Sequence, residues 1–292
     1  MDGVFKQNLH EKTTPGGPFL IQLLFSQLEA MPDRDVMTSV MERHCGTVEC
    51  FCYDEKMAGF AARNHTAAFK DGSAPVQLMV MACTGFSGTD IDPFLKSQMW
   101  DCREDRDRLL ARCRYQVVAV DMLAAGLPAK ERAELDMDLM EAMAELYPAC
   151  EAFYFPNCGK LFSAEDVREH RIPREDRFIR FGVNARFFNI QGTDNMLVDT
   201  VGMSTLFLPD LQYHFHGMDP NWVVNHAYSL ASYLLQYDQP IRSGETVDGV
   251  MDGRMSREVQ WTCQYEGALI QPSREVLDIH MGAYASGTRG DI

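Results

Sequence analysis

The chain of 292 residues has no uninterrupted apolar run of about 18 residues, the length that a helix needs to cross a bilayer. We therefore expect no membrane-spanning helix. Residues 1–17 also lack the apolar core of a secretory signal, and Thr13-Thr14-Pro15-Gly16-Gly17 predicts a flexible arm instead.

Basic residues are scarce. Lys and Arg number 27 against 42 Asp and Glu, which gives a formal net charge of −15. Because phosphate contacts require clustered basic side chains, this charge argues against a general nucleic-acid-binding protein. It is compatible with a basic protein partner, although an acidic surface often serves only solubility.

Common catalytic and nucleotide-binding motifs are missing. The sequence contains no Gly-x-x-x-x-Gly-Lys-Ser/Thr, no Gly-x-Gly-x-x-Gly after a predicted strand and no His-Glu-x-x-His. Gly85-Phe86-Ser87-Gly88-Thr89 differs from a nucleophile elbow because its last residue is Thr rather than Gly. These absences favour a non-enzymatic protein.

Cysteines are present, but they do not predict a disulfide framework. Their number is odd and their spacing is irregular, whereas secreted disulfide-rich domains are short and carry paired cysteines. Reduced thiols in a cytoplasm are the simpler interpretation. The nine cysteines are residues 45, 50, 52, 83, 102, 113, 150, 158 and 263.

Residues 18–163 alternate between strand-like and helix-like patterns. Phe19–Ser26 and Tyr115–Met122 are apolar runs typical of strands, and the helix after Leu127-Pro128 repeats apolar residues at spacings of three and four. This order predicts an α+β fold with a mostly antiparallel sheet and helices on one face. A ferredoxin-like α/β sandwich is the architecture that we expect for this domain.

A second, smaller α+β module is expected over residues 178–283. Residues 164–177 are highly charged and contain Pro173, so we expect a charged linker there. Phe178–Val183 predicts the first strand of the module, and Asp219-Pro220 predicts the start of a helix that ends near Tyr237. Residues 284–292 are expected to form a C-terminal tail.

One set of residues in this module resembles a known family. Together with the helix containing Ala231-Ser232-Tyr233, the set resembles the bacterial family catalogued as domain of unknown function 4261, over roughly Phe178 to Gly249. Upstream, Ala152–Ser163 resembles the segment that commonly precedes this module. The motif residues are Asp199, Thr200, Gly202, Leu208, Pro209, Asp210, Gly244 and Thr246.

The resemblance implies a bacterial cytoplasmic protein without an established reaction, in a class that includes accessory or immunity-type proteins. The motif residues themselves favour structural roles. Glycines give backbone freedom at turns, Pro209 fixes φ at a strand boundary, and Thr200 and Thr246 can tie loops through local hydrogen bonds.

His214 and His216 form the sharpest candidate for chemistry. Alternate residues of a strand point to the same side about 6.5 Å apart, so the two imidazoles could hold one metal ion. We expect Glu245 to be the third ligand of this metal ion. The alternative is a pair of histidines on an exposed strand, and other acidic or histidine ligands in the module are His226, Asp210 and Asp248.

Four acidic residues fall on one face of the helix after Leu127-Pro128. Such a stripe could dock a basic partner by long-range attraction, and the alternative is that it forms the solvent side of an amphipathic helix. The four residues are Glu134, Asp138, Glu141 and Glu145.

The first hypothesis from these patterns is a non-enzymatic protein-binding module of the immunity or adaptor type, with no cofactor and with a basic protein as its partner. The second is a metal-dependent hydrolase centred on His214 and His216, with one divalent metal as its cofactor. The sequence does not fix the oligomeric state.

Overall fold

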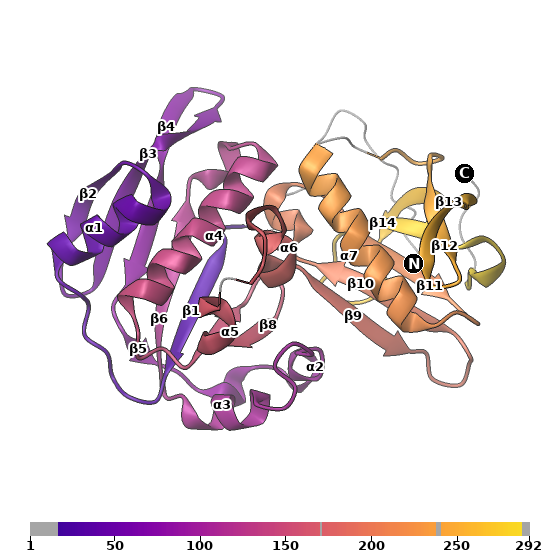
Figure 1. Cartoon of the computed structure of the whole chain (residues 1–292), viewed down its shortest axis with the longest axis horizontal. Helices are drawn as coiled ribbons and strands as arrows, with labels where there is room; N and C mark the ends of the chain where they lie inside the picture. Colours follow the sequence, from indigo (N-terminus) through magenta and orange to yellow (C-terminus); the bar gives the residue numbers. More distant parts are fainter. Residues whose placement is uncertain (1–16, 170, 238–240, 288–292) are drawn as a thin grey trace. The chain divides into compact units, whose positions relative to one another are not determined.

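The computed structural model describes residues 17–169, 171–237 and 241–287, which fold into two compact units (Figure 1). The chain passes from the first unit to the second between Gly182 and Val183. Each unit has its own mostly antiparallel sheet and its own helices, so the predicted α+β class is confirmed. None of the helices in these ranges is both long and apolar enough to span a membrane.

The first unit is built on an eight-stranded antiparallel sheet in the order β2-β3-β4-β6-β1-β7-β8, with β5 paired to the start of β6. β3 and β4 form a hairpin around the turn Lys70-Asp71-Gly72-Ser73. The strands are β1 (Leu20–Phe25), β2 (Val48–Tyr53), β3 (Met57–Phe69), β4 (Gly72–Met81), β5 (Thr84–Gly85), β6 (Tyr115–Met122), β7 (Ala152–Phe155) and β8 (Lys160–Ser163).

The helices of the first unit lie between these strands in sequence. The α-helices are α1 (Arg34–Cys45), α2 (Pro93–Ser97), α3 (Arg106–Arg112), α4 (Ala129–Leu146), α5 (Ala164–Arg168) and α6 (Arg177–Gly182). Short 3-10 turns are η1 (Gly88–Asp90), η2 (Ala124–Gly126) and η3 (Arg174–Asp176).

The four central strands have the ferredoxin-like arrangement that the sequence predicts. Along the chain they occur as β1, α1, β4, β6, α4 and β7, with β2 and β3 inserted after α1. In the sheet they lie in the order β4-β6-β1-β7. The helices α1 and α4 pack against each other on one face of this sheet (Figure 1).

The face under α1 and α4 holds the main core of the first unit. Its residues alternate along each strand with residues of the other face, as the two-residue period of a strand requires. The core residues, all at most 1% exposed, are Ile21, Leu23, Ala58, Phe60, Val76, Leu78, Val80, Val117 and Ala119.

The other face is covered only in part. A second core lies where the segment containing α2 and α3 packs over β1, β7 and β8. It consists of Leu24, Ile91, Met99, Cys102, Leu109, Leu110, Cys113, Ala152, Tyr154 and Leu161, with Phe86 and Leu95 beside it. The same face of β3, β4 and β6 does not belong to this cluster.

The second unit has a six-stranded sheet in the order β12-β13-β14-β11-β10-β9, in which β11 and β14 are parallel. The helix α7 (Pro220–Tyr237) packs on β9, β10, β11 and β12, and it begins and ends where the sequence predicts. The strands are β9 (Asn184–Asn189), β10 (Met196–Val201), β11 (Asp210–Phe215), β12 (Thr246–Met251), β13 (Arg254–Gly267) and β14 (Glu275–His280). The 3-10 turns are η4 (Met203–Leu206) and η5 (Gly282–Tyr284).

Residues 164–177 do not separate the two units. They contain α5 and η3 and belong to the first unit, which continues to Gly182. Their charges have partners inside that unit, because Arg174 and Arg177 both contact Asp138 of α4. A highly charged segment is typical of a linker, but here the ion pairs with Asp138 attach the segment to α4.

Phe178–Val183, expected as a strand, is mostly helical. Residues 177–182 form α6, and Phe178 and Phe181 both pack into the aromatic core, against Phe19 and Phe155 respectively. A spacing of three places both rings on one side of a helix, whereas a strand would send them to opposite sides.

The two ends of the chain were expected to be an arm and a tail. Residues 1–16 of the arm and residues 288–292 of the tail lie outside the described residues. Within the described part of the tail, Ala285 bridges to Phe215 and the Ser286 N–H donates to the carbonyl of His214 at 2.9 Å. This part of the tail is therefore bound to the end of β11.

Candidate functional site

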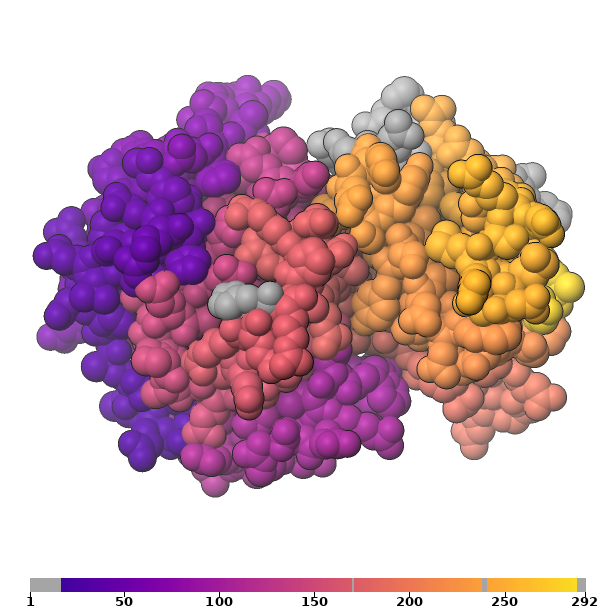
Figure 2. Space-filling view, viewed as in Figure 1, coloured from indigo at the N-terminus to yellow at the C-terminus, as the bar shows by residue number. Residues whose placement is uncertain are grey.

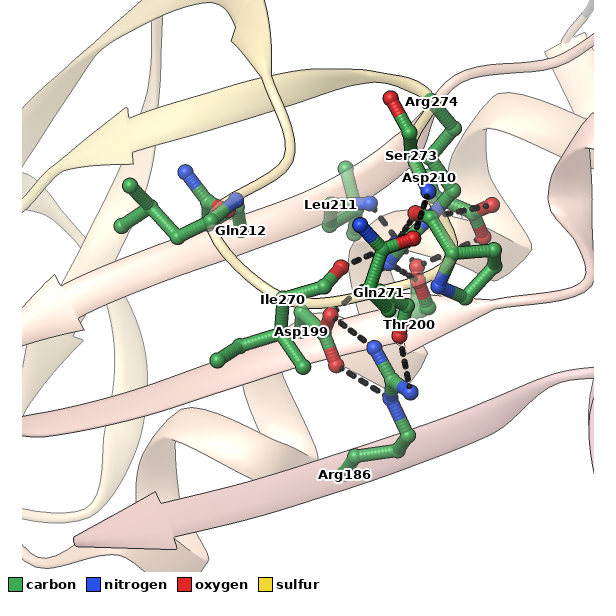
Figure 3. A network of polar contacts seen from close by, with 12 residues as sticks. Arg186, Asp199, Thr200, Asp210, Leu211, Gln212, Ile270, Gln271, Ser273 and Arg274 are labelled. Carbon is green, nitrogen blue, oxygen red and sulfur yellow. Dashed lines mark hydrogen bonds and ion pairs between the residues drawn. The ribbon is translucent and has the colours of Figure 1, made fainter. Parts of the chain in front are cut away.

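Asp199 in β10 lies at the centre of a buried ionic network (Figure 3). Arg186, opposite it on β9, donates from Nε to Oδ1 at 2.8 Å and from Nη2 to Oδ2 at 2.5 Å. Arg274, just before β14, donates from Nη2 to the same Oδ2 at 2.8 Å. Because Asp199 is fully buried, these two guanidinium groups replace the water that would otherwise solvate its carboxylate.

Asp210 at the start of β11 continues the network. Its Oδ2 accepts from Arg274 Nε at 3.2 Å, and its Oδ1 accepts from Thr200 Oγ1 and from the Met203 N–H, both at 3.1 Å. Thr200 Oγ1 in turn accepts from the Leu211 N–H at 2.8 Å. Burial raises the pKa of Asp210, and the charge of Arg274 acts in the opposite direction.

The loop between β13 and β14 closes over this network (Figure 3). Arg274 donates from Nη1 to the carbonyls of Ile270 at 3.1 Å and Pro272 at 2.9 Å. Arg186 donates from Nη1 to the carbonyl of Gln271 at 2.8 Å. The same two arginines that neutralise the carboxylates therefore also fix the loop.

Gln212 extends the polar contacts across the sheet. Its Nε2 donates to Asp278 Oδ2 at 3.1 Å, and its Oε1 accepts from the Leu269 N–H at 2.8 Å. The strand register places Arg186, Asp199, Gln212 and Asp278 side by side on β9, β10, β11 and β14. All four are at most 1% exposed, so a buried polar row crosses four strands.

The opposite face of β11 packs under α7. The Tyr213 hydroxyl and His226 Nδ1 are 2.9 Å apart, and His226 Nε2 lies 2.8 Å from the Asp248 carbonyl. Because a carbonyl only accepts, Nε2 carries the proton and Nδ1 accepts from the tyrosine. Burial lowers the pKa of His226, which favours this neutral form, so His226 serves as a core residue.

The network resembles a scaffold more than a reaction centre. Its acidic groups are engaged by arginine, glutamine, threonine or backbone N–H donors. Thr200 and Asp210, which could act as a hydroxyl and a base, are both fully buried. The arrangement joins β9, β10, β11, β14 and the β13–β14 loop through hydrogen bonds and ion pairs.

Three of the predicted motif residues, Asp199, Thr200 and Asp210, belong to this network. Gly202 follows β10 with φ of 131°, and Gly244 lies in a turn with φ of 90°. Side chains rarely adopt such positive φ values, so both glycines serve the turns that they occupy.

The other motif residues lie in short connections. The Leu208 N–H donates to the Met203 carbonyl at 3.2 Å, and Pro209 leads directly into β11. Thr246 Oγ1 donates to Gln260 Oε1 at 2.9 Å across the β12–β13 pair. The Leu208 contact is local to its turn, whereas the Thr246 contact joins two neighbouring strands.

His214, His216 and Glu245 each contact other parts of the chain. A Cβ on Gly287 would lie 2.6 Å from His214 Nδ1, so that ring rests against the tail backbone. His216 lies beyond the end of β11 and is exposed, with Nδ1 2.9 Å from Ser286 Oγ. Glu245 Oε2 accepts from the Arg242 N–H at 2.7 Å within its own turn.

No group of three His, Cys, Asp or Glu side chains with metal-binding geometry occurs among residues 17–169, 171–237 and 241–287. The two-residue alternation on which the histidine pair was based ends at Phe215, because the chain leaves the strand there. The described geometry therefore does not assemble the expected ligand set.

The acidic stripe of α4 contacts basic residues of the same chain. Asp138 accepts from Arg174 at 2.6 Å and from Arg177 at 2.8 Å, and Arg177 also pairs with Glu141. In the space-filling view, the segment that follows β8 covers part of α4 (Figure 2). Asp138 and Glu141, in the middle of the stripe, are therefore engaged by arginines of the same chain.

Both ends of the stripe are exposed to solvent, since the side chain of Glu145 is 44% exposed. Glu145 pairs with Arg43 and His44 of α1, and its pKa is lowered mainly by hydrogen bonding to His44. Glu134 lies 3.8 Å from Arg174 and its side chain is 37% exposed. The contact of Glu134 is longer than the 2.7 Å contact between Glu145 and His44, so the Glu134 end is the more weakly held.

Sequence reasoning missed four members of the network: Arg186, Gln212, Arg274 and Asp278. A signal was available for two of them. Arg186 stands between Ala185 and Phe187, and Asp278 stands between Leu277 and Ile279. A charged residue in the middle of an apolar strand indicates a buried partner, but the sequence does not say which residue supplies it.

Neither the curated proteins nor the solved structures include a match to this chain. A family match exists for one segment. It begins at Asp199 in β10 and ends at His280 in β14, so it includes Asp210, Arg274 and Asp278 but not Arg186. The resemblance noted from the motif residues is thereby confirmed: residues 199–280 match the family described as Domain of unknown function (DUF4261).

Proposed function

We propose that this is a non-enzymatic protein of the bacterial cytoplasm that binds another protein on the open face of its first sheet. The open face is the side of β1, β3, β4 and β6 away from α1 and α4. It consists of Leu20, Gln22, Met57, Gly59, Ala61, Gln77, Met79, Met81, Val118, Val120 and Met122.

The strand register supports this grouping. Leu20, Val120, Met79 and Gly59 lie opposite one another across β1, β6, β4 and β3. The ring of Phe51, at the bulge of the edge strand β2, reaches over Gly59, where a Cβ would lie 2.7 Å from it. An apolar row therefore extends across five strands.

The composition of this face carries the proposal. An antiparallel sheet with one face in water normally alternates apolar and polar residues. Here the outward positions of β4 and β6 include the apolar residues Met79, Met81, Val118 and Val120. Each of them is partly exposed to solvent. Strands that are apolar on both faces are expected to be covered on both faces.

Methionine suits such a surface because its side chain is flexible and polarisable and adapts to different partners. Met122 is 40% exposed and Phe51 is 47% exposed at the margins of the face. Exposed aromatic and methionine side chains are enriched in protein interfaces. The cytoplasmic location is supported by the free thiol form of all nine cysteines.

The partner expected from composition was basic. The carboxylates expected to receive it are already paired with arginines of the first unit, and the open face carries no charged residue. We therefore assign the binding role to apolar contact rather than to charge attraction. The buried network of the second unit then stabilises the fold of that unit and takes no part in binding.

Site-specific photocrosslinking in the native cell tests this proposal. A photoreactive amino acid at Met122 should give a discrete crosslinked protein species. The same residue at Met251, which is 43% exposed in the second unit, is the matched control and should not give that species. Identical crosslinking at both positions, or none at Met122, would contradict the proposal.

A further inference from the structure

We infer that the protein on the open face is a second copy of this chain. The inference rests on the proposed function, and it names the partner. Its basis is the shape, charge and size of the open face, taken together with the charge of the whole chain.

The shape requires a partner with a comparable surface. Two sheets pack face to face when both are similarly twisted and both present interdigitating side chains about 10 Å apart. A second open face meets this requirement. In a twofold dimer, the row formed by Leu20, Val120, Met79 and Gly59 would lie across the same row of the other copy.

The charge distribution restricts where two copies can meet. Each chain carries a formal net charge of −15, so two copies repel, and they can associate only where the contact does not also bury acidic groups. The open face meets that condition, because its polar members Gln22 and Gln77 are uncharged. The nearest ion pair on the outward side of β2 and β3, between Glu49 and Arg63, is exposed at the edge.

The size of the face predicts a reversible dimer. Four strands about 4.8 Å apart, with two outward residues on β1 and three on each of β3, β4 and β6, cover roughly 350 Å². A stable interface uses about 800 Å² on each partner. The copies should therefore associate at micromolar concentrations and separate on dilution.

Sedimentation equilibrium of the purified full chain from about 1 to 200 μM tests the inference. We expect a monomer–dimer equilibrium that Met122→Glu and Phe51→Glu each weaken at least tenfold, because a twofold interface would bury each new carboxylate twice. The matched controls are Met251→Glu and Met255→Glu, whose parent residues are 43% and 49% exposed in the second unit. They should leave the equilibrium unchanged.

Salt gives a second readout. Because the face carries no charge and the two chains repel, raising the ionic strength should strengthen the dimer or leave it unchanged. A chain that stays monomeric up to 200 μM, or a dimer that Met251→Glu weakens as much as Met122→Glu does, would overturn the inference.

The crosslinking experiment separates this failure from failure of the proposed function. A crosslinked species at Met122 with twice the mass of the chain supports both. A species containing a different protein overturns the second-copy inference and leaves the binding function supported.

Discussion

Asp199 and Asp136 are both fully buried carboxyl groups, but their surroundings differ. Asp199 accepts hydrogen bonds from two arginines, whereas both oxygens of Asp136 lack a donor in hydrogen-bonding contact. The nearest guanidinium, Arg132, lies 4.0 Å from Asp136 and donates instead to Asp121 at 2.7 Å. Burial raises the pKa of Asp136 well above its ordinary value, and the neighbouring Asp121 acts in the same direction.

Asp136→Asn should therefore change how stability depends on pH. A carboxyl group with a raised pKa keeps its proton when folded and loses it when unfolded above about pH 4. The free energy of unfolding then falls with rising pH by about 1.4 kcal/mol per unit, up to the folded-state pKa. Asparagine has no such proton, so urea unfolding at pH 5, 6 and 7 should show the variant gaining stability relative to the native chain. Parallel pH profiles would contradict this assignment.

Arg274 is the residue on which the network of the second unit depends most. It contacts Asp199, Asp210 and the carbonyl of Thr200, and its side chain is 9% exposed. Removing one partner of a buried ion pair leaves a charge without compensation.

Arg274→Met should destabilise the second unit by about 3 kcal/mol or more in chemical unfolding. Arg257→Met is the control, because Arg257 is 95% exposed and lies 4.0 Å from Asp248. Its effect should stay below about 0.5 kcal/mol. Equal effects of the two variants would show that the network contributes no more than a surface contact.

At the scale of elements, α4 differs from the amphipathic helix that its sequence predicts. Its acidic positions are held by arginines from the segment that follows β8 and by residues of α1. The charged segment of residues 164–177 and the acidic stripe are therefore two halves of one contact. Periodicity located the helix correctly, but it did not identify what lies on the acidic side.

Asp138→Ala should detach part of this contact. The side chain of Asp138 is 10% exposed and binds both Arg174 and Arg177, so its loss should cost about 3 kcal/mol of unfolding free energy. Glu134→Ala, on the same helix face but 37% exposed, should cost about 0.5 kcal/mol or less. Thermal unfolding of the two variants measures the difference, and a solvent-facing stripe would instead give two small and equal effects.

At the scale of the whole molecule, the acidic charge and the open face have to be considered together. A net charge of −15 keeps copies of the chain apart over most of their surface. The open face of the first sheet carries no charged residue, and it is the surface to which we assign binding. The net charge opposes association, and the uncharged face is where association would bury no acidic group.

Much of the fold could be predicted from local patterns. The strands Leu20–Phe25 and Tyr115–Met122, the β3–β4 hairpin and the helix Pro220–Tyr237 follow from apolar spacing and turn residues. The short helix Arg177–Gly182 was wrongly expected as a strand, because a run of six apolar-rich residues is ambiguous until the surface against which it packs is known.

By itself, the sequence determined the α+β class, the acidic charge and the motif that matches the family. Only the tertiary structure decided which charges pair, since Arg186, Asp199 and Arg274 come from distant parts of the chain. It also decided that the outward methionines of β4 and β6 share one face. The physical reason is that strand pairing and ion pairing join residues far apart in sequence, and local periodicity carries no information about which segments meet.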